Sequence, residues 1–504
     1  MGALTDIARE SRKVEAHRPW PRTIVTSEVW RRLTKELVDA GATLLGLWGD
    51  AGAVHLALIG EPSSEIAVFT LECPEGKFPS VGAAHPPAIR PERAIRDLYG
   101  LKPVGASDTR RWLDLGFWGV TEPLGADRPS RKRQGAYAFL PVEGEDLHQI
   151  PVGPVHAGII EPGHFRFTAN GETVVRLEER LGYVHKGIEG LMTGADLDKG
   201  AKLAGRTSGD STVAYAFAFA QAVEAALQVK VPERAVWLRA LMAELERIAN
   251  HFGDIGAICN DASFSLMHAE CGILRERTLR ASQACFGHRL MMDRIVPGGL
   301  TQDLAPGGLA RLGSLLEFVK RRFPELIEIY DNTASLQDRT VTTGYLAPTL
   351  ARAFGAGGYV GRASGRAFDA RKALRYAPYD TLEFEAPVRD DGDVNARVWI
   401  RIREVEQSLR LIEQILETLP QGPVRTGLDA VTGASEGLGL VEGFRGDILV
   451  YVRLNEGGTI ARCHLRDPSW FQWPLLEACI EGNIVADFPL CNKSFNCSYS
   501  GHDL

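Results

Sequence analysis

The sequence predicts an α+β protein, in which a small N-terminal α/β domain is joined to a larger, mainly helical domain with strands at both ends. Three observations lead to this prediction. Short apolar runs separated by Gly, Pro and Ser alternate with helical patterns in residues 1–125. Residues 126–150 are polar and rich in Pro, Gly and charge, as linkers are. Long helical patterns dominate residues 151–504. A chain of 504 residues is also long enough for several domains.

The N-terminal domain is expected to contain two helices and three strands. Residues 27–40 have helical periodicity, with Ser27 as a suitable N-cap. A second, shorter helix occupies residues 89–100 and stops at Gly100. The predicted strands are 43–48, 54–59 and 66–71.

The second domain is expected to open with strands and continue as helices. Asn170-Gly171 is a hairpin turn signal and is followed by a strand at 173–177. A turn at Arg206–Ser211 leads into a long apolar helix, and Pro297-Gly-Gly299 separates two later helices. The remaining predicted helices are 232–251, about 268–287, about 306–328 and 394–419, and the last strands are 448–454 and 461–464.

Composition limits the function. A net charge of −7 and a pI near 6.0, without a long basic block, argue against a nucleic acid partner. The first 22 residues lack the apolar core of a secretory signal, so we expect an intracellular protein. Eight cysteines without a C-x-x-C pair are typical of reduced thiols. The apolar run 211–229 contains Gln221 and Glu224 and is mostly alanine, which favours a buried core helix over a membrane span.

The N-terminal domain carries a short signature. It consists of Phe78-Pro-Ser-Val81, Glu92-Arg93 and Asp97-Leu-Tyr-Gly100. With the strands before it, this signature resembles the smaller of two adjoining peripheral-arm subunits of respiratory complex I. We interpret the charged residues of this helix, Glu92, Arg93, Arg96 and Asp97, as a charged helix face without a catalytic role.

The second domain carries several longer motifs. They include Gly153-Pro154, Glu161-Pro-Gly-His164, the run Tyr183–Glu189, Pro232-Glu-Arg with Glu244, Arg247 and His251, Arg362-Ala-Ser-Gly365, and Glu442-Gly-Phe-Arg445-Gly. Residues 151–504 resemble the large subunit of nickel–iron hydrogenases and its relative, the larger adjoining subunit of complex I. The fusion of both modules resembles the large subunit of membrane-bound energy-converting hydrogenases, such as that of formate hydrogenlyase.

The resemblance implies a metal site whose ligands are missing. Such hydrogenases hold nickel and iron with four cysteines in two C-x-x-C pairs, and here the matching positions are Ser208, Ser211, Ser498 and Gly501. A neutral hydroxyl is a poor donor to these soft metals. We therefore expect no metal or other cofactor bound by this chain, and an iron–sulfur cluster in a partner subunit.

The resemblance also implies four candidate catalytic residues around this position. Glu161 matches a glutamate that relays protons, and a carboxyl in an apolar cleft would have a raised pKa. Arg445 matches an arginine that overhangs the metal site, and Arg206 and Asp210 are expected to form a charged pair in the same cleft. The structural alternative is that all four are hydrogen-bonded polar groups that fix the fold.

Three functions follow as hypotheses. The first is a nickel-free, hydrogenase-like large subunit of a complex-I-like assembly that couples electron transfer to proton or ion translocation. The second is reduction of a quinone with electrons from the partner cluster, and the third is a scaffold without chemistry of its own. The expected partners are a small iron–sulfur subunit and membrane ion-translocating subunits. They would hold the chain peripherally on the cytoplasmic face of the plasma membrane. Catalysis by this chain stays open, and hydrogenase activity is not expected.

Overall fold

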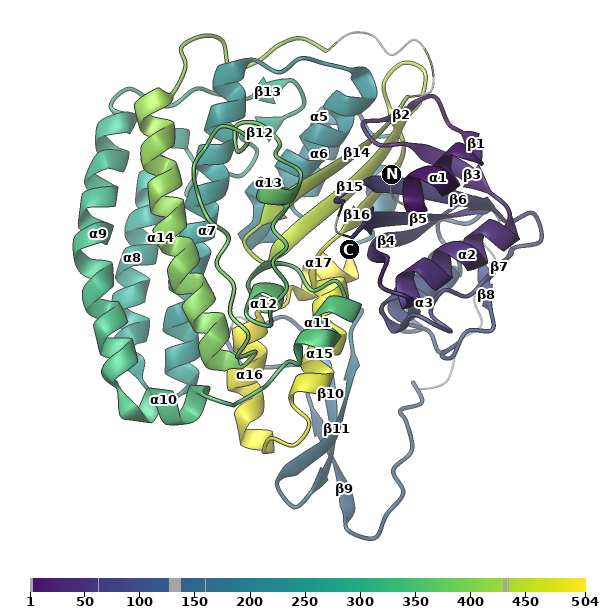
Figure 1. The fold of residues 1–504 in the computed structure, drawn as a ribbon, viewed down its shortest axis with the longest axis horizontal. Coiled ribbons are helices and arrows are strands. Elements are labelled where there is room, and N and C mark those ends of the chain that lie inside the picture. The colour runs from purple at the N-terminus through teal and green to yellow at the C-terminus, as the bar shows by residue number, and fades with distance from the viewer. Residues whose placement is uncertain (1–2, 62, 127–136, 159, 429–432, 434) are drawn as a thin grey trace.

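The structure is a computed structural model that describes residues 3–61, 63–126, 137–158, 160–428, 433 and 435–504. The N-terminal domain lies to one side of a central sheet, and a bundle of long helices lies on the other (Figure 1). A three-stranded sheet projects below both. The α+β class predicted from the sequence is confirmed.

The N-terminal domain is built on a five-stranded sheet with strand order β1-β3-β6-β5-β4. All neighbours are antiparallel except β3 and β6. The strands are β1 (Arg12–Lys13), β3 (Arg22–Val25), β4 (Ala42–Asp50), β5 (Ala53–Gly60) and β6 (Ile66–Glu72), with β7 (Lys77–Pro79) and β8 (Lys102–Val104) pairing apart. The helices are α1 (Ala3–Arg9), α2 (Ser27–Val38) and α3 (Ile89–Tyr99). The predicted helices and strands are confirmed, but the N-cap of α2 is Thr26, not Ser27, because the Thr26 hydroxyl accepts from the Val29 N–H.

Most of the charged residues of α3 do not form an exposed helix face, so that part of the interpretation was wrong. Glu92, Arg93 and Asp97 are buried. The Asp97 carboxylate accepts from the backbone N–H groups of residues 112, 113 and 114, while Glu92 accepts from those of residues 81 and 82. Buried carboxylates need such donors. The signature therefore ties two loops to the helix.

Between the two domains, the predicted linker 126–150 is only partly described, since residues 127–136 lie outside the described part of the chain. Its last residues already belong to β9 (Leu147–Val152). β9 pairs with β10 (His164–Asn170), which forms the predicted hairpin with β11 (Thr173–Arg180) around Asn170-Gly171.

The second domain is centred on a sheet with order β16-β15-β14-β2. Its strands are β14 (Ser435–Gly443), β15 (Gly446–Leu454), β16 (Ile460–Arg466) and the N-terminal β2 (His17–Arg18). The long helices are α6 (Thr212–Leu227), α7 (Glu233–Asp261), α8 (Ser265–Phe286), α9 (Gly308–Asn332) and α14 (Val394–Thr418). Each lies where a helix was predicted, but α7 continues beyond its predicted end at His251. Within the described residues, no helix is both long and apolar enough to cross a membrane.

Shorter elements connect these layers and carry the functional turns. They are α4 (Ile188–Met192), α5 (Leu197–Gly205), β12 (Ile295–Val296), β13 (Gly299–Leu300), α10 (Ala334–Thr340), α11 (Pro348–Ala353), α12 (Gly358–Arg362), α13 (Ala370–Ala373), α15 (Ser469–Cys479), α16 (Phe488–Phe495) and α17 (Tyr499–Asp503). One-turn helices also occupy 86–88, 209–211 and 485–487.

Glycines in β14 let α6 approach the central sheet closely. A β-carbon at Gly437 would overlap the carbonyl oxygen of Ala222, which is fixed in the helix. Overpacking of this kind typically costs about 1–3 kcal/mol, and we expect Gly437→Ala to lower the free energy of unfolding by that amount in a urea titration. Gly313→Ala in α9 is the matched control. A β-carbon there meets nothing within 4 Å, so alanine should stabilise the helix by about 0.5–1 kcal/mol. Equal stability of the two variants would contradict the close approach.

Candidate functional site

The turn between α5 and α6 presents two serines inward. α5 ends at Gly205, and Ser208 then takes an extended conformation before a one-turn helix at residues 209–211. Ser208 and Ser211 are 3% and 2% exposed, respectively. The turn therefore delivers both side chains into the protein, as the sequence predicted.

The C-terminal tail brings the second half of the site to the same place. α16 ends at Phe495, and its C-cap Asn496 has a left-handed conformation (φ 45°) that reverses the chain. Ser498 then caps α17, accepting from the Gly501 N–H at 2.9 Å. Its hydroxyl lies 2.8 Å from the Ser208 hydroxyl. The two segments that match the two C-x-x-C pairs thus meet, although Ser208 and Ser498 are 290 residues apart in the sequence.

Asp210 and Arg445 complete this cluster, which we call the serine centre (Ser208, Asp210, Ser211, Arg445 and Ser498). Arg445 follows β14, is 4% exposed and binds the Asp210 carboxylate with both terminal nitrogens, one of them at 2.8 Å. It also donates to the Ser211 hydroxyl at 3.2 Å, while Ser208 donates to Asp210 at 2.8 Å. The serine centre is closed by hydrogen bonds among its own side chains.

The serine centre keeps Asp210 ionised. Burial acts to raise the pKa of the Asp210 carboxyl, but the Arg445 guanidinium and the Ser208 hydroxyl outweigh it and hold this pKa at about 2. The Asp210 side chain is 37% exposed. A carboxylate paired in this way is a fixed charge at neutral pH rather than a group that exchanges protons.

Arg206 is outside the serine centre, so the predicted pair between Arg206 and Asp210 was wrong. Arg206 caps the end of α5, with its side chain 43% exposed, and its terminal nitrogens bind Asp293, one at 2.8 Å. The Arg206 side chain contacts Asp293, whereas the Asp210 side chain contacts Arg445, so the two leave the turn in different directions. Arg445, not Arg206, is the partner of Asp210.

Glu161 reaches the edge of the site through the tail. It is partly buried, and its carboxylate accepts from the Ser500 N–H at 3.1 Å, two residues beyond Ser498. On the same side, Lys186 donates to the carbonyls of Arg206 at 3.0 Å and Thr207 at 2.8 Å. These hydrogen bonds from Lys186 to the turn were not predicted from the sequence, although Lys186 lies in the run Tyr183–Glu189.

The position that matches the fourth cysteine has no room for a side chain. A β-carbon on Gly501 would overlap a carboxylate oxygen of Asp467 and lie 2.9 Å from the Ser498 hydroxyl. Asp467 cannot easily move, because it accepts from the Tyr215 hydroxyl at 2.7 Å and from the Ser469 N–H at 2.8 Å. Asp467 and Tyr215 were not identified from the sequence, since neither belongs to a motif.

The donor set does not fit a thiolate-held metal centre. The nearby Cys497 is 6% exposed, and burial raises the pKa of its thiol well above the usual value, so it stays protonated. A cysteine binds such metals as the thiolate, not as the protonated thiol. Among the described residues, no group of three or more His, Cys, Asp and Glu side chains is arranged to hold a metal ion.

The tight space at Gly501 gives a test. We expect Gly501→Ala to lower the free energy of unfolding by about 1–3 kcal/mol, since the new methyl group must displace Asp467 or the tail. Gly209→Ala is the control in the same site, because a β-carbon there meets nothing within 4 Å. Its effect should stay within about 0.5 kcal/mol. A tolerated Gly501→Ala, measured by urea denaturation, would show that the tail can move aside.

Comparisons with known proteins cover both domains. Residues 263–436 and 429–503 match the family described as "Respiratory-chain NADH dehydrogenase, 49 Kd subunit". Residues 50–134 match "Respiratory-chain NADH dehydrogenase, 30 Kd subunit". The two modules recognised in the sequence are therefore both present in one chain.

Individual relatives match along most of their length. The chain is 31% identical to formate hydrogenlyase subunit 5 of Escherichia coli over 437 residues, which cover 85% of this chain and 77% of the relative. It is 28% identical to an NADH-quinone oxidoreductase subunit of Phocaeicola vulgatus, covering 82% and 85%. A chain in the structure of the membrane-bound sulfane sulfur reductase, an archaeal respiratory membrane complex, superposes with a TM-score of 0.68 at 26% identity, covering 72% of this chain and all of that one.

Proposed function

The chain belongs to the family of fused 30 Kd and 49 Kd complex I modules that includes the large subunits of formate hydrogenlyase-type hydrogenases, and we propose that it is a nickel-free large subunit of a complex-I-like membrane oxidoreductase. In this role it takes part in electron transfer coupled to proton or ion translocation. The observation that carries the proposal is the serine centre, where Ser208, Ser211 and Ser498 stand at three of the four ligand positions.

The relatives support partners in a membrane complex, while the iron–sulfur partner is part of the proposal alone. Their names describe subunits of hydrogenases, of an NADH-quinone oxidoreductase and of a respiratory membrane complex. We assign this chain a small iron–sulfur subunit as electron donor or acceptor, and membrane subunits that move the ion. The chain then lies peripherally on the cytoplasmic face of the plasma membrane.

Metal analysis of the purified complex tests the proposal directly. The intact complex is analysed for nickel and iron by mass spectrometry, and both are related to the amount of this chain. We expect iron from the partner cluster and nickel far below one atom per chain. Stoichiometric nickel would overturn the proposal.

A second candidate, quinone reduction, draws on the likeness to the NADH-quinone oxidoreductase relative. The resemblance to the larger complex I subunit implies that a tyrosine near the position of Gly209 would contact the quinone headgroup, and this chain lacks that tyrosine, which counts against this candidate. Quinone reductase activity of the purified complex, measured with a soluble quinone, separates this candidate from the scaffold hypothesis, in which the complex assembles through this chain but the chain performs no chemistry.

Glu161 is the residue whose replacement best separates proton transfer from a purely structural role. It reaches the tail from a partly exposed position, whereas Asp210 is held ionised by Arg445. We expect Glu161→Gln to lower the turnover of the assembled complex by about 10²-fold, the usual contribution of a positioned proton-transfer group. Glu456→Gln, in the exposed turn between β15 and β16, is the control. Unchanged turnover of a fully assembled Glu161→Gln complex would favour the scaffold role.

A further inference from the structure

Asp467 lies in the turn between β16 and α15 and is 0% exposed. One of its carboxylate oxygens, Oδ2, accepts from the Tyr215 hydroxyl at 2.7 Å, and the other accepts from the Ser469 N–H at 2.8 Å. Oδ2 is also the oxygen that a β-carbon on Gly501 would overlap. The Asp467 carboxylate therefore takes up the space that the first atom of a side chain at position 501 would need.

The two hydrogen-bond partners of Asp467 lead to the two halves of the serine centre. Tyr215 lies on α6, four residues after Ser211. The Ser469 hydroxyl accepts from the Ser498 N–H at 2.8 Å. Asp467 and the residue two positions after it thus connect the start of α6 to the C-terminal tail.

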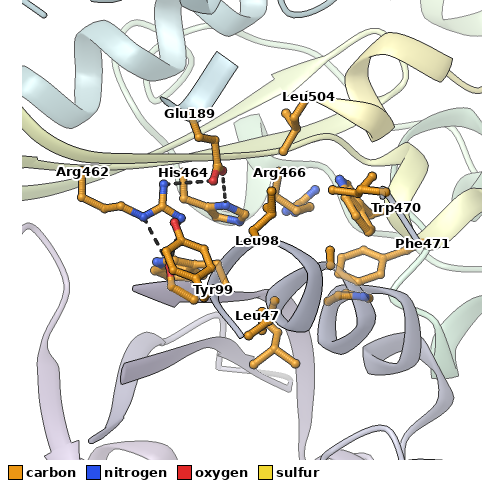
Figure 2. A pocket seen from close by; sticks show the side chains of 16 residues that line it. Leu47, Leu98, Tyr99, Glu189, Arg462, His464, Arg466, Trp470, Phe471 and Leu504 are labelled. Atoms are coloured by element: carbon orange, nitrogen blue, oxygen red, sulfur yellow. Dashed lines mark hydrogen bonds and ion pairs between the residues drawn. The ribbon is translucent and has the colours of Figure 1, made fainter. Parts of the chain in front are cut away.

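The turn that carries Asp467 is also fixed from the side of the N-terminal domain. Figure 2 shows its sequence neighbours Arg466 and Trp470 at the junction of the two domains, where they line a small cavity. The Arg466 Nε donates to the carbonyl of Leu45 in β4 at 2.6 Å. The Trp470 indole stacks on His502, with the ring centroids 4.1 Å apart. A shift of Asp467 away from the tail would disturb these contacts.

The charge of Asp467 is compensated by the protein itself. Burial acts to lower the pKa of the Arg445 guanidinium, but Asp210 and Asp467 outweigh it and raise this pKa well above its usual value. Burial and Asp467 raise the pKa of the Tyr215 hydroxyl well above its usual value, so it stays a donor. A buried carboxylate needs such partners. With Arg445 nearby and Tyr215 as a donor, Asp467 requires no metal ion to balance it.

We propose that Asp467 is the residue that closes the serine centre to metals. Its carboxylate, held by Tyr215 and Ser469, takes the place of a fourth ligand side chain at Gly501. Cysteine substitutions at the four ligand positions alone therefore do not create a metal site, because the fourth thiolate has no room. This role of Asp467 rests on the proposed nickel-free function of the chain.

Metal binding by the full chain tests this role. Zn²⁺ is the probe, because four thiolates hold it in tetrahedral sites. The four-cysteine variant carries Ser208→Cys, Ser211→Cys, Ser498→Cys and Gly501→Cys, and the open variant carries Asp467→Ala in addition. Calorimetric titration under reducing conditions should show binding to the open variant tighter by about tenfold or more. The native protein is the control for binding elsewhere on the chain. Equal affinities of the two variants, or no binding by either, would overturn the proposal.

Urea denaturation gives a second test that does not depend on metal. We expect Gly501→Ala to lower the urea midpoint less than half as much in an Asp467→Ala background as in the native protein, because the methyl group enters the space left by the carboxylate. Any cost of the unpaired Tyr215 hydroxyl is common to both proteins of that background and cancels. Gly209→Ala, whose β-carbon meets nothing within 4 Å, should act alike in both backgrounds. Equal losses from Gly501→Ala in the two backgrounds would overturn the proposal.

Both tests can fail separately from the proposed function. Stoichiometric nickel in the native complex would contradict the nickel-free function. Equal behaviour of the variants with and without Asp467 would contradict only the role of Asp467.

Discussion

Replacing Arg362 with methionine is expected to lower the free energy of unfolding by about 3–5 kcal/mol, the usual cost of removing one partner from a buried ion pair. Arg362 ends α12 and is 0% exposed. Its guanidinium binds Glu404 of α14 at 2.6 Å and Glu442 of β14 at 2.9 Å. It therefore connects the helical bundle to the central sheet at a point that water does not reach.

The loss of stability would be large because Arg362 neutralises both Glu404 and Glu442, and methionine at this position neutralises neither. Burial and the neighbouring Asp369 raise the pKa of the Glu442 carboxyl, Arg362 opposes them, and the net result is a pKa of about 7. Methionine approximates the length of the arginine stem but supplies no charge, so two acids would be left buried and underpaired.

Arg403→Met is the matched control. Arg403 lies on the same helix as Glu404, but its side chain is 55% exposed and pairs with Glu406 at 2.8 Å. Exposed pairs contribute about 0–1 kcal/mol. Urea titrations of both variants measure the difference. Similar losses in both, or a small loss in Arg362→Met, would show that the buried network is dispensable for stability.

Much of the fold follows from local sequence patterns. Helical periodicity located α7 and α14, and Gly100 marked the end of α3 through its left-handed conformation (φ 75°). Asn170-Gly171 located the β10–β11 hairpin. These features depend on residues that are close in the chain, so they can be predicted without knowledge of tertiary contacts.

Features that depend on distant contacts were missed. β14 alternates leucines with glycines: Leu438 and Leu440 are buried, whereas Gly437 and Gly439 lie against α6, a contact that the sequence alone does not reveal. β2 pairs with β14 across more than 400 residues. The charged residues of α3 looked solvated because their loop partners, residues 81–82 and 112–114, cannot be identified from the helix itself.

In the candidate site, too, one feature was predicted correctly and another, which depends on a distant contact, was not. The meeting of Ser208 and Ser498 was predicted through resemblance to a known four-ligand arrangement, and the structure places them 2.8 Å apart. The pairing of Asp210 depends on side-chain directions that differ between neighbouring residues of a tight turn. Sequence proximity favoured Arg206, but the structure gives Arg445, from a strand end 235 residues away.

Glu246 is expected to make the stability of the protein fall with rising pH. It lies on α7, is 7% exposed, and its carboxyl oxygens accept from the Val213 N–H at 2.7 Å and the Ala214 N–H at 3.1 Å, at the start of α6. Burial is the main cause that raises the pKa of this carboxyl; the two N–H groups oppose the rise, Asp210 adds to it, and the net pKa is about 8 instead of 4.5.

The sign follows from proton binding. Between pH 4.5 and about 8 the folded protein keeps a proton on Glu246 that the unfolded chain has lost. The contribution of Glu246 is therefore fully present below pH 4.5 and is lost as the pH rises through 8. At about 1.4 kcal/mol per pKa unit the loss is roughly 5 kcal/mol over the whole window.

Glu246→Gln should remove this dependence, because glutamine stays neutral at every pH. We expect the melting temperature of the variant, relative to the native protein, to rise steadily between pH 5 and 8. Glu233→Gln, at the exposed start of the same helix, should follow the native protein throughout. Other buried groups that titrate in this range, such as Glu92, are present in all three proteins and cancel in the comparison. Parallel curves for the native protein and Glu246→Gln would mean that Glu246 is ionised beside Asp210. The start of α6 would then hold two negative charges, with Arg445 beside Asp210 and Arg247 near Glu246 as neighbouring cations.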